Sequence, residues 1–258
     1  MEVKFWWSLV GLAMMRPLGA LLFLPLCGTS TLGGLLIRNS LVLMVALPVL
    51  PLLALQVLPD PIQAPGDYVL LLGSELAVGL VLGFSAAIAF WAVDSAGFLL
   101  DTLRGASMAG VLNPMFGGQS SPLGAFFSQL LVALFMTLGG FHSFLSAIYN
   151  SYEFLKPGRP LHWTEQFIPF LKCEWHLLYT LALSFAMPAM VMMILVDLAL
   201  GLINRSVQQL NVFALSMPIK CATAVLMLII GLQFGLSDVI VRLERFDGGL
   251  MRTLESGR

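Results

Sequence analysis

The stretch YVLLLGSELAVGLVLGFSAAIAFWAVDSAGFLL, residues 68–100, decides the fold class of this chain. It is longer than the roughly 20 apolar residues that cross a lipid bilayer as one helix, and its only charged residues are Glu75 and Asp94. The 258-residue chain as a whole is 59% hydrophobic and 10% charged, whereas a soluble domain carries about 25% charged residues. We therefore predict an all-α, polytopic membrane protein.

Further apolar stretches flank this one and predict about six long helices in all, kinked by prolines and paired as helical hairpins. These stretches are residues 5–26, 39–58, 123–150, 177–203 and 212–237. We expect the first to bend at Arg16-Pro17, because proline removes a backbone donor, and to be a retained span, because a cleavable signal sequence is shorter. Residues 151–176 mix both charge signs with two tryptophans, and they predict an interfacial loop or a short amphipathic helix.

Several charged residues lie within or beside these apolar stretches, where a charge at the centre of a membrane helix costs about 2.5–3.5 kcal/mol. They are Arg16, Glu75, Asp94, Asp101, Arg104, Asp197, Arg205 and Lys220. We predict that they are buried charges that fix the packing of this chain against other subunits. Asp94 and Asp101 share a helix face, Arg104 follows Asp101 at the i, i+3 spacing of an ion pair, and Lys220 has no predicted partner. The alternative is that the acidic members relay protons in a secondary transporter of a small molecule.

Small residues indicate where helices approach one another closely. Gly79 and Gly83 have the GxxxG spacing that lets the backbones of two membrane helices touch, and three alanines follow them before residue 90. The segment 79–90 therefore predicts dense helix-on-helix packing.

The sequence excludes the common classes of enzyme site. It holds no HExxH metal motif and no serine in a GxSxG turn. Asp94 and Asp197 lie in separate apolar stretches, as in intramembrane aspartyl proteases, but the GxGD motif of those enzymes is missing. The three cysteines are widely spaced, so we expect them to pack as small apolar residues. A net charge of -1 predicts no nucleic-acid surface, and we predict no cofactor and no metal.

Residues 105–122 differ from the charged loops that normally join membrane helices. No Asp, Glu, Lys or Arg occurs from Gly105 to Tyr152, and the first part of this run is crowded with Gly, Ser, Pro, Asn and Met. Ser121 and Pro122 predict the cap and first turn of the next helix. Soft apolar side chains on a flexible backbone suit a segment that closes a dry constriction yet moves aside. An ordinary re-entrant or extramembrane turn is the alternative.

Four stretches carry a resemblance to a known family. They are MRPLGALLFLPLCG (15–28), NPMFGGQSSPLGAFF (113–127), MPAMVMMILVDLALGLINRSVQQLNVF (187–213) and SMPIKCATAVLML (216–228). Through these motifs the chain resembles the FliR/SpaR/YscT family of type III secretion export proteins over nearly its whole length, and we prefer the virulence type over the flagellar type. At position 113 it has Asn, where an Asp is familiar in flagellar members.

The resemblance implies a non-enzymatic, pore-forming subunit of the export gate in the bacterial inner membrane, which lines and seals a channel for unfolded secreted proteins. One copy would join about five R-type and about four S-type subunits in a helical assembly, the arrangement that heterologous contacts generate. It also implies as partners the U-type switch protein, the V-type export ring, the inner rod and needle subunits, substrates in transit and membrane lipid.

The same resemblance implies a division of the chain. Residues 1–175 resemble the R subunit, and residues 176–240 form a helical hairpin that resembles the S subunit. Residues 241–258 are a polar tail whose arginines predict a cytoplasmic location. Residues 105–122 match the place of a plug loop in the closed pore. The implied seal residues are Met108, Asn113, Pro114, Met115, Phe116, Gly117, Gly118, Gln119 and Ser120.

Overall fold

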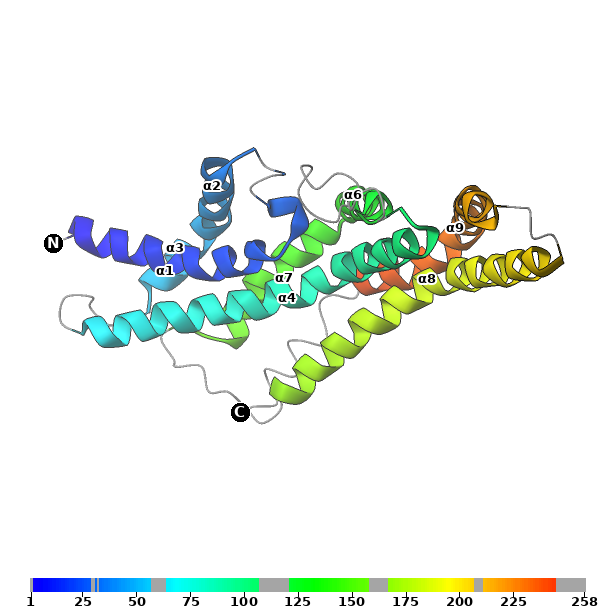
Figure 1. The fold of residues 1–258 in the computed structure, drawn as a ribbon. Coiled ribbons are helices and arrows are strands. Elements are labelled where there is room, and N and C mark those ends of the chain that lie inside the picture. The colour runs from blue at the N-terminus through cyan, green and yellow to red at the C-terminus, as the bar shows by residue number, and fades with distance from the viewer. Residues whose placement is uncertain are drawn as a thin grey trace. The chain divides into compact units, whose positions relative to one another are not determined.

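The regular elements among the described residues are all helices (Figure 1). The computed structural model describes residues 2–28, 31, 33–56, 64–106, 121–157, 167–206 and 211–244, with the backbone alone at 2–5, 212–213 and 231–244. In chain order the elements are α1 (Glu2–Leu22), η1 (Pro25–Cys27), α2 (Leu35–Ala46), η2 (Leu47–Val49), α3 (Leu50–Ala54), α4 (Pro65–Arg104), α6 (Pro122–Thr137), α7 (Gly140–Phe154), α8 (Phe167–Ser206) and α9 (Val212–Glu244).

The predicted apolar stretches are helical over most of their length, which confirms the all-α fold class. α1 continues through Pro17 as one helix, and α4 carries residues 68–100 as one unbroken helix of 40 residues. Among the described residues, the spans long and apolar enough to cross a membrane are Leu35–Ala54, α4 and α8, and the bent pair α6 and α7 is a fourth if it counts as one span. The chain is therefore an all-α polytopic membrane protein.

Two predicted boundaries are wrong. Residues 123–150 form two helices instead of one, because the chain turns at Gly139, whose φ of 80° is in the left-handed region that favours glycine. A Cβ on the next residue, Gly140, would overlap the ring of Phe135, so the second glycine makes room for the turn. Of residues 151–176, where a loop or a short separate helix was predicted, residues 158–166 lie outside the described residues. The described residues at both ends are helical beyond the predicted boundaries, since residues 151–154 extend α7 and residues 167–176 are the opening turns of α8.

The chain divides into two compact units. The first comprises Met1–Ile88, Phe135–Glu174 and Leu243–Arg258, and the second comprises Ala89–Leu134 and Trp175–Arg242. α4 contributes its first part to the first unit and its last part to the second.

In the first unit, α1 packs against the first part of α4 through glycine. A Cβ on Gly79 would overlap the carbonyl oxygen of Arg16, and one on Gly83 would overlap that of Ala20. The hydroxyl of Tyr68 donates a hydrogen bond to the carbonyl oxygen of Ser8 at 2.7 Å, at the other end of the same contact. The predicted close packing at the GxxxG motif is confirmed, since these backbones touch where no side chain intervenes.

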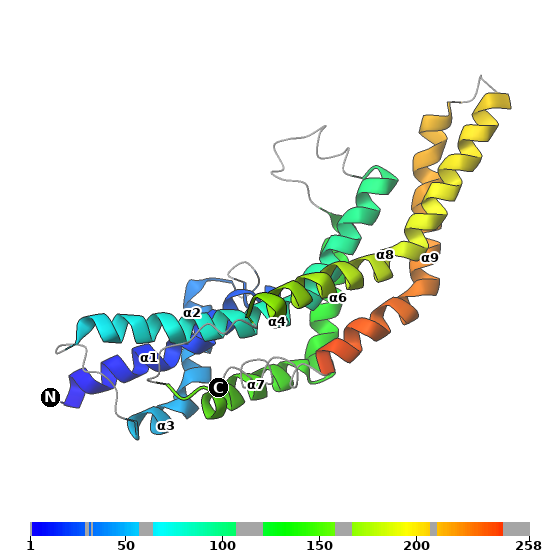
Figure 2. The ribbon, with the colours of Figure 1, turned by 90° about the horizontal axis from the view of Figure 1, so that it is seen from below.

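The second unit contains the last part of α4 with α6, α8 and α9. α8 and α9 run side by side as an antiparallel hairpin (Figure 2). Phe127 of α6 packs edge-on against Phe185 of α8, with ring centroids 5.0 Å apart. Gly97 of α4 lies so close to Gly124 of α6 that a Cβ on Gly97 would overlap it. The last turns of α4 and the first turns of α6 are therefore held backbone to backbone.

Candidate functional site

Arg16 is the centre of a buried polar network in the first unit. Its guanidinium donates to both carboxylate oxygens of Glu75, from Nε to Oε2 at 2.8 Å and from Nη2 to Oε1 at 3.0 Å. It also donates to the hydroxyl of Ser151 at 2.9 Å and to the carbonyl oxygen of Leu155 at 3.0 Å, and it lies 4.0 Å from the centroid of the Tyr152 ring. Arg16 is 1% exposed and Glu75 is 4% exposed.

This network joins three helices that are distant in sequence. Arg16 comes from α1 and Glu75 from α4, while the other partners lie on or just after α7. A bidentate arginine–carboxylate pair fixes the distance and the direction of both side chains. Each oxygen of the Glu75 carboxylate accepts a hydrogen bond from Arg16, so the pair connects α1 to α4. The sequence singled out the two charges but gave no signal for the residues of α7.

Asp101 is the second buried charge, and it connects the two ends of the segment 105–122. It is 2% exposed. Its Oδ1 pairs with Nη2 of Arg104 at 2.6 Å, at the i, i+3 spacing noted in the sequence. Its Oδ2 accepts hydrogen bonds from the hydroxyl of Ser121 at 2.7 Å and from the backbone N–H of Leu123 at 2.9 Å. One carboxylate thus ties the end of α4 to the beginning of α6, across 20 residues of sequence.

The end of α4 is closed by a glycine cap. Gly105 has a φ of 84°. Its N–H donates to the carbonyl oxygen of Thr102 at 3.2 Å, and the N–H of Ala106 donates to that of Asp101 at 2.9 Å. This pair of bonds is the Schellman motif, in which a left-handed residue ends a helix and satisfies its last carbonyls. Leucine, valine and the other residues with a Cβ disfavour this backbone, so the glycine sets where α4 stops.

The beginning of α6 is capped as predicted. The hydroxyl of Ser121 accepts a hydrogen bond from the N–H of Gly124 at 2.9 Å, and Pro122 is the first helical residue. An oxygen at this position satisfies one of the backbone donors that a helix leaves free at its first turn. The predicted seal therefore lies between two capped helix ends that Asp101 joins. The nine predicted seal residues from Met108 to Ser120 lie outside the described residues.

Lys220 has a partner, contrary to the prediction that it stands alone. Its Nζ lies 2.7 Å from Oδ2 of Asp197, and it also donates to the carbonyl oxygen of Leu103 at 3.3 Å. These contacts link α9 to α8 and to the last turn of α4 within the second unit. The ammonium therefore fixes the register of the hairpin against α4.

Three of the predicted buried charges are exposed on this chain. Asp94, Asp197 and Arg205 all reach solvent, although Asp197 does so while paired with Lys220. These three side chains are therefore not buried by this chain itself. Burial against another subunit stays a prediction.

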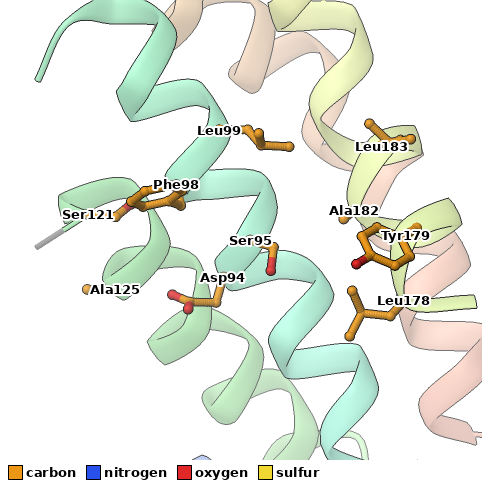
Figure 3. A pocket seen from close by; sticks show the side chains of 10 residues that line it. All are labelled: Asp94, Ser95, Phe98, Leu99, Ser121, Ala125, Leu178, Tyr179, Ala182 and Leu183. Atoms are coloured by element: carbon orange, nitrogen blue, oxygen red, sulfur yellow. The ribbon is translucent and has the colours of Figure 1, made fainter. Parts of the chain in front are cut away.

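Asp94 lies in a groove of the second unit (Figure 3). The groove has a volume of about 670 Å³ and is lined by residues of α4, α6 and α8. Figure 3 shows α4 in the middle, with Asp94 on the side of α6 and Tyr179 on α8 at the opposite side. The Oδ1 of Asp94 would lie 2.8 Å from a Cβ on Gly124, so the carboxylate rests against bare backbone. Among the described residues no ion pair joins Asp94 to a cation, and no group of His, Cys, Asp and Glu is placed to hold a metal ion.

Comparison with known proteins decides the family. A model described as bacterial export proteins, family 1, matches residues 7–245. The chain belongs to this family. The match covers both units, and it confirms the resemblance to the FliR/SpaR/YscT proteins of type III secretion.

Named relatives of this export protein agree with the family model. The secretion system apparatus protein SsaT of Salmonella typhimurium is 41% identical over 95% of each chain. The Yop proteins translocation protein T of Yersinia pestis is 38% identical over 85% of this chain and 84% of its own. The flagellar biosynthetic protein FliR of Bacillus subtilis is 33% identical over 67% of each chain.

The family consists of structural components of export apparatus and is not a family of enzymes. This export protein is therefore a membrane component of a protein-secretion apparatus that works with other apparatus subunits. The charges in all three ion-paired networks described above have structural partners within the chain, which fits a packing role better than a catalytic one.

Proposed function

We propose that this export protein is a pore-forming subunit of the type III secretion export gate in the bacterial inner membrane, where it lines and seals the channel for unfolded secreted proteins. Residues 105–122 are the movable seal. The observation that supports this role best is the joining of both ends of that segment by the buried carboxylate of Asp101. A seal must move aside for a polypeptide and then return to its closed position. Because both ends of the segment are held together, the segment returns to the same place.

The composition of the segment supports the same role. A charged loop stays hydrated and draws ions with it, whereas an uncharged loop with methionine and phenylalanine excludes both. Hydrophobic constrictions close channels to ions by excluding water. The neutral segment therefore blocks small ions without needing a tight fit, and glycines let it repack around substrates of different shape.

Assembly with partner subunits is the second part of the proposal. Many large apolar side chains of α8 and α9 are exposed on this chain, among them Ile194, Leu198, Leu202, Ile229 and Ile230. An apolar surface of this kind on a component of an apparatus marks contacts with other subunits or with lipid. About five R-type and about four S-type subunits, arranged helically, are the proposed neighbours. The U-type switch protein, the V-type ring, rod and needle subunits and substrates complete the set.

Within this proposal, residues 1–175 act as the R-like part, residues 176–240 as the S-like hairpin, and residues 241–258 as a cytoplasmic tail. The identities to the relatives named for secretion and Yop translocation exceed the identity to the flagellar relative. A virulence-type system is therefore the proposed context.

The experiment is deletion of residues 107–119 in the complete secretion apparatus. We expect the complex to assemble and the membrane to leak small ions, measured as loss of membrane potential in cells that express the gate. Deletion of residues 58–63, within the proline-rich stretch LPDPIQAPGD, is the control and should leave the membrane tight. An intact permeability barrier in the first deletion, with a normal yield of complex, overturns the sealing role.

The transporter alternative makes a different prediction for the acidic residues. A proton relay needs carboxylates that gain and lose protons, but Glu75 is held by Arg16 and Asp197 is held by Lys220. Neutralising either residue should therefore reduce assembly with partner subunits, measured by co-purification in mild detergent. Loss of small-molecule uptake with normal assembly would favour the transporter.

A further inference from the structure

We propose that the groove beside Asp94 is a docking site for a neighbouring export subunit, and that this neighbour places a basic side chain against the Asp94 carboxylate from an otherwise apolar helix. The inference rests on the proposed function, since it names the chemistry of one of the contacts that assembly requires. The groove lies wholly within the second unit.

The charge of Asp94 is the first argument. Asp94 lies in α4, a helix long and apolar enough to span a membrane, and such a helix tolerates a carboxylate only when it meets water or a counter-charge. The neighbouring acids have their counter-charges within the chain, because Asp101 pairs with Arg104 and Asp197 pairs with Lys220. Among the described residues Asp94 has no such partner. A cation from outside the chain completes the pattern.

The shape of the groove is the second argument. Beside the carboxylate the lining is small, with Ser95 on α4 and Ala125 on α6 (Figure 3). Gly124 adds no side chain there. A volume of about 670 Å³ accepts a long side chain together with part of the helix that carries it. The methylene stem of lysine or arginine packs along apolar walls while its head reaches the charge.

The rim of the groove is the third argument. Phe98 on α4 and Tyr179 and Leu183 on α8 are large and partly exposed. The exposed apolar residues continue along α8 at Met187 and Val191, so that successive turns present one apolar stripe. A stripe at this spacing takes the apolar face of another helix. A soluble cation would use the carboxylate but not the stripe.

The partner is a different subunit and not a second copy of this chain. Arg16, Arg104 and Lys220, the basic residues within its apolar helices that meet carboxylates, are already paired inside the chain. Arg38 of α2 and Arg205 of α8 have no ion pair among the described residues, so charge alone does not decide against a second copy. The proposed function places one copy of this chain among R-type and S-type subunits, and the neighbour is therefore one of those subunits.

The first test is site-specific photo-crosslinking in the assembled apparatus. Phe98 is replaced by p-benzoylphenylalanine, an aromatic residue of similar shape, and the adduct is identified by mass spectrometry. We expect a cross-link to a helix of another export subunit, within one turn of a lysine or arginine. Adducts confined to lipid, or to a second copy of this chain, overturn the docking proposal.

The second test is a set of charge variants in the same apparatus. Asp94→Asn should weaken retention of the cross-linked subunit at least about tenfold, because it leaves a desolvated basic group without its partner. Asp94→Glu should retain most of the association. Asp67→Asn is the matched control, since Asp67 is an exposed acid in the first turn of the same helix. Equal retention in Asp94→Asn and Asp67→Asn overturns the proposal.

The two tests separate this inference from the function on which it rests. If the wild-type chain recovers no export subunits at all in mild detergent, the proposed function fails. If the complex is recovered intact and Asp94→Asn changes nothing, only the docking site fails.

Discussion

Removal of the Arg16 charge should destabilise the chain strongly, while removal of both partners should not. Arg16→Met keeps most of the length of the side chain but leaves the carboxylate of Glu75, which is 4% exposed, without its counter-charge. It also leaves the Ser151 hydroxyl and the Leu155 carbonyl oxygen without their donor. Breaking a buried ion pair by removing one partner costs about 3–5 kcal/mol. We expect a loss of that size in the free energy of unfolding.

The double variant Arg16→Met/Glu75→Leu tests the reason for this loss. Replacing both members of a buried ion pair by apolar residues of similar size is often close to neutral, because the large cost of desolvating two charges disappears with them. We therefore expect the double variant to lie within about 1–2 kcal/mol of the wild type, which requires a coupling energy of several kcal/mol between the two sites.

The measurement is denaturant unfolding of the detergent-solubilised chain, followed by the fluorescence of its five tryptophans. Glu75→Gln is the intermediate variant, because an amide oxygen still accepts one hydrogen bond from Arg16. If Arg16→Met costs less than about 1 kcal/mol, the pair is not desolvated as the distances indicate. Glu75→Leu completes the set of single variants. If the double variant loses as much as Arg16→Met and Glu75→Leu together, the two residues act independently and the reasoning is refuted.

Three further predictions address other contacts. Ser121→Ala removes a helix cap, so it should cost about 1 kcal/mol and raise the rate of backbone hydrogen exchange in the first turn of α6 about fivefold. Asp101→Ala should raise that exchange rate further, because Asp101 also joins α4 to α6. Equal protection from exchange in both variants would contradict the joining role of Asp101. Gly79→Ala should lower the stability of the chain, because the added Cβ would overlap the backbone of Arg16. Gly73→Ala on the same helix has open space around the added Cβ and should raise the stability by up to about 1 kcal/mol. Thermal unfolding compares the two variants. Burial raises the pKa of the Cys27 thiol to about 11. At pH 8 only about one molecule in a thousand therefore carries the reactive thiolate. Alkylation followed by mass spectrometry should find Cys27 unlabelled until the pH approaches 11.

The helices could be predicted because each depends on a continuous apolar run. The positions at which the helices are interrupted were harder to predict. Hydropathy stays high across residues 136–141, so the turn at Gly139 is invisible to a composition argument, although the adjacent pair of glycines was a usable signal. The opening of α8 was missed for the opposite reason. Its first residues are polar enough to resemble a loop, but they extend a helix whose later turns are apolar.

The ion pairs also differ in how far the sequence predicts them. Asp101 and Arg104 are three residues apart on one helix, so helix geometry allows their ion pair whatever the tertiary packing, and the structure contains it. Lys220 and Asp197 meet across a hairpin, and their pairing depends on its register, which the sequence does not specify. The cysteines show a similar limit. Cys27 is buried as predicted, but Cys173 is exposed, because a helix that packs on one side leaves positions on the other side open.

The Arg16 network has a consequence for the synthesis of the chain. Its hydrogen-bond partners lie 59, 135 and 139 residues farther along the sequence. At about 5–20 residues per second, a ribosome needs on the order of ten seconds between making the arginine and making the last of them. Until Glu75 is made, 59 residues after the arginine, the nascent protein holds an unneutralised cation in its first apolar helix. That helix cannot adopt its final packing before Glu75 is present, so a product truncated before residue 75 should be recognised and degraded as an incomplete chain.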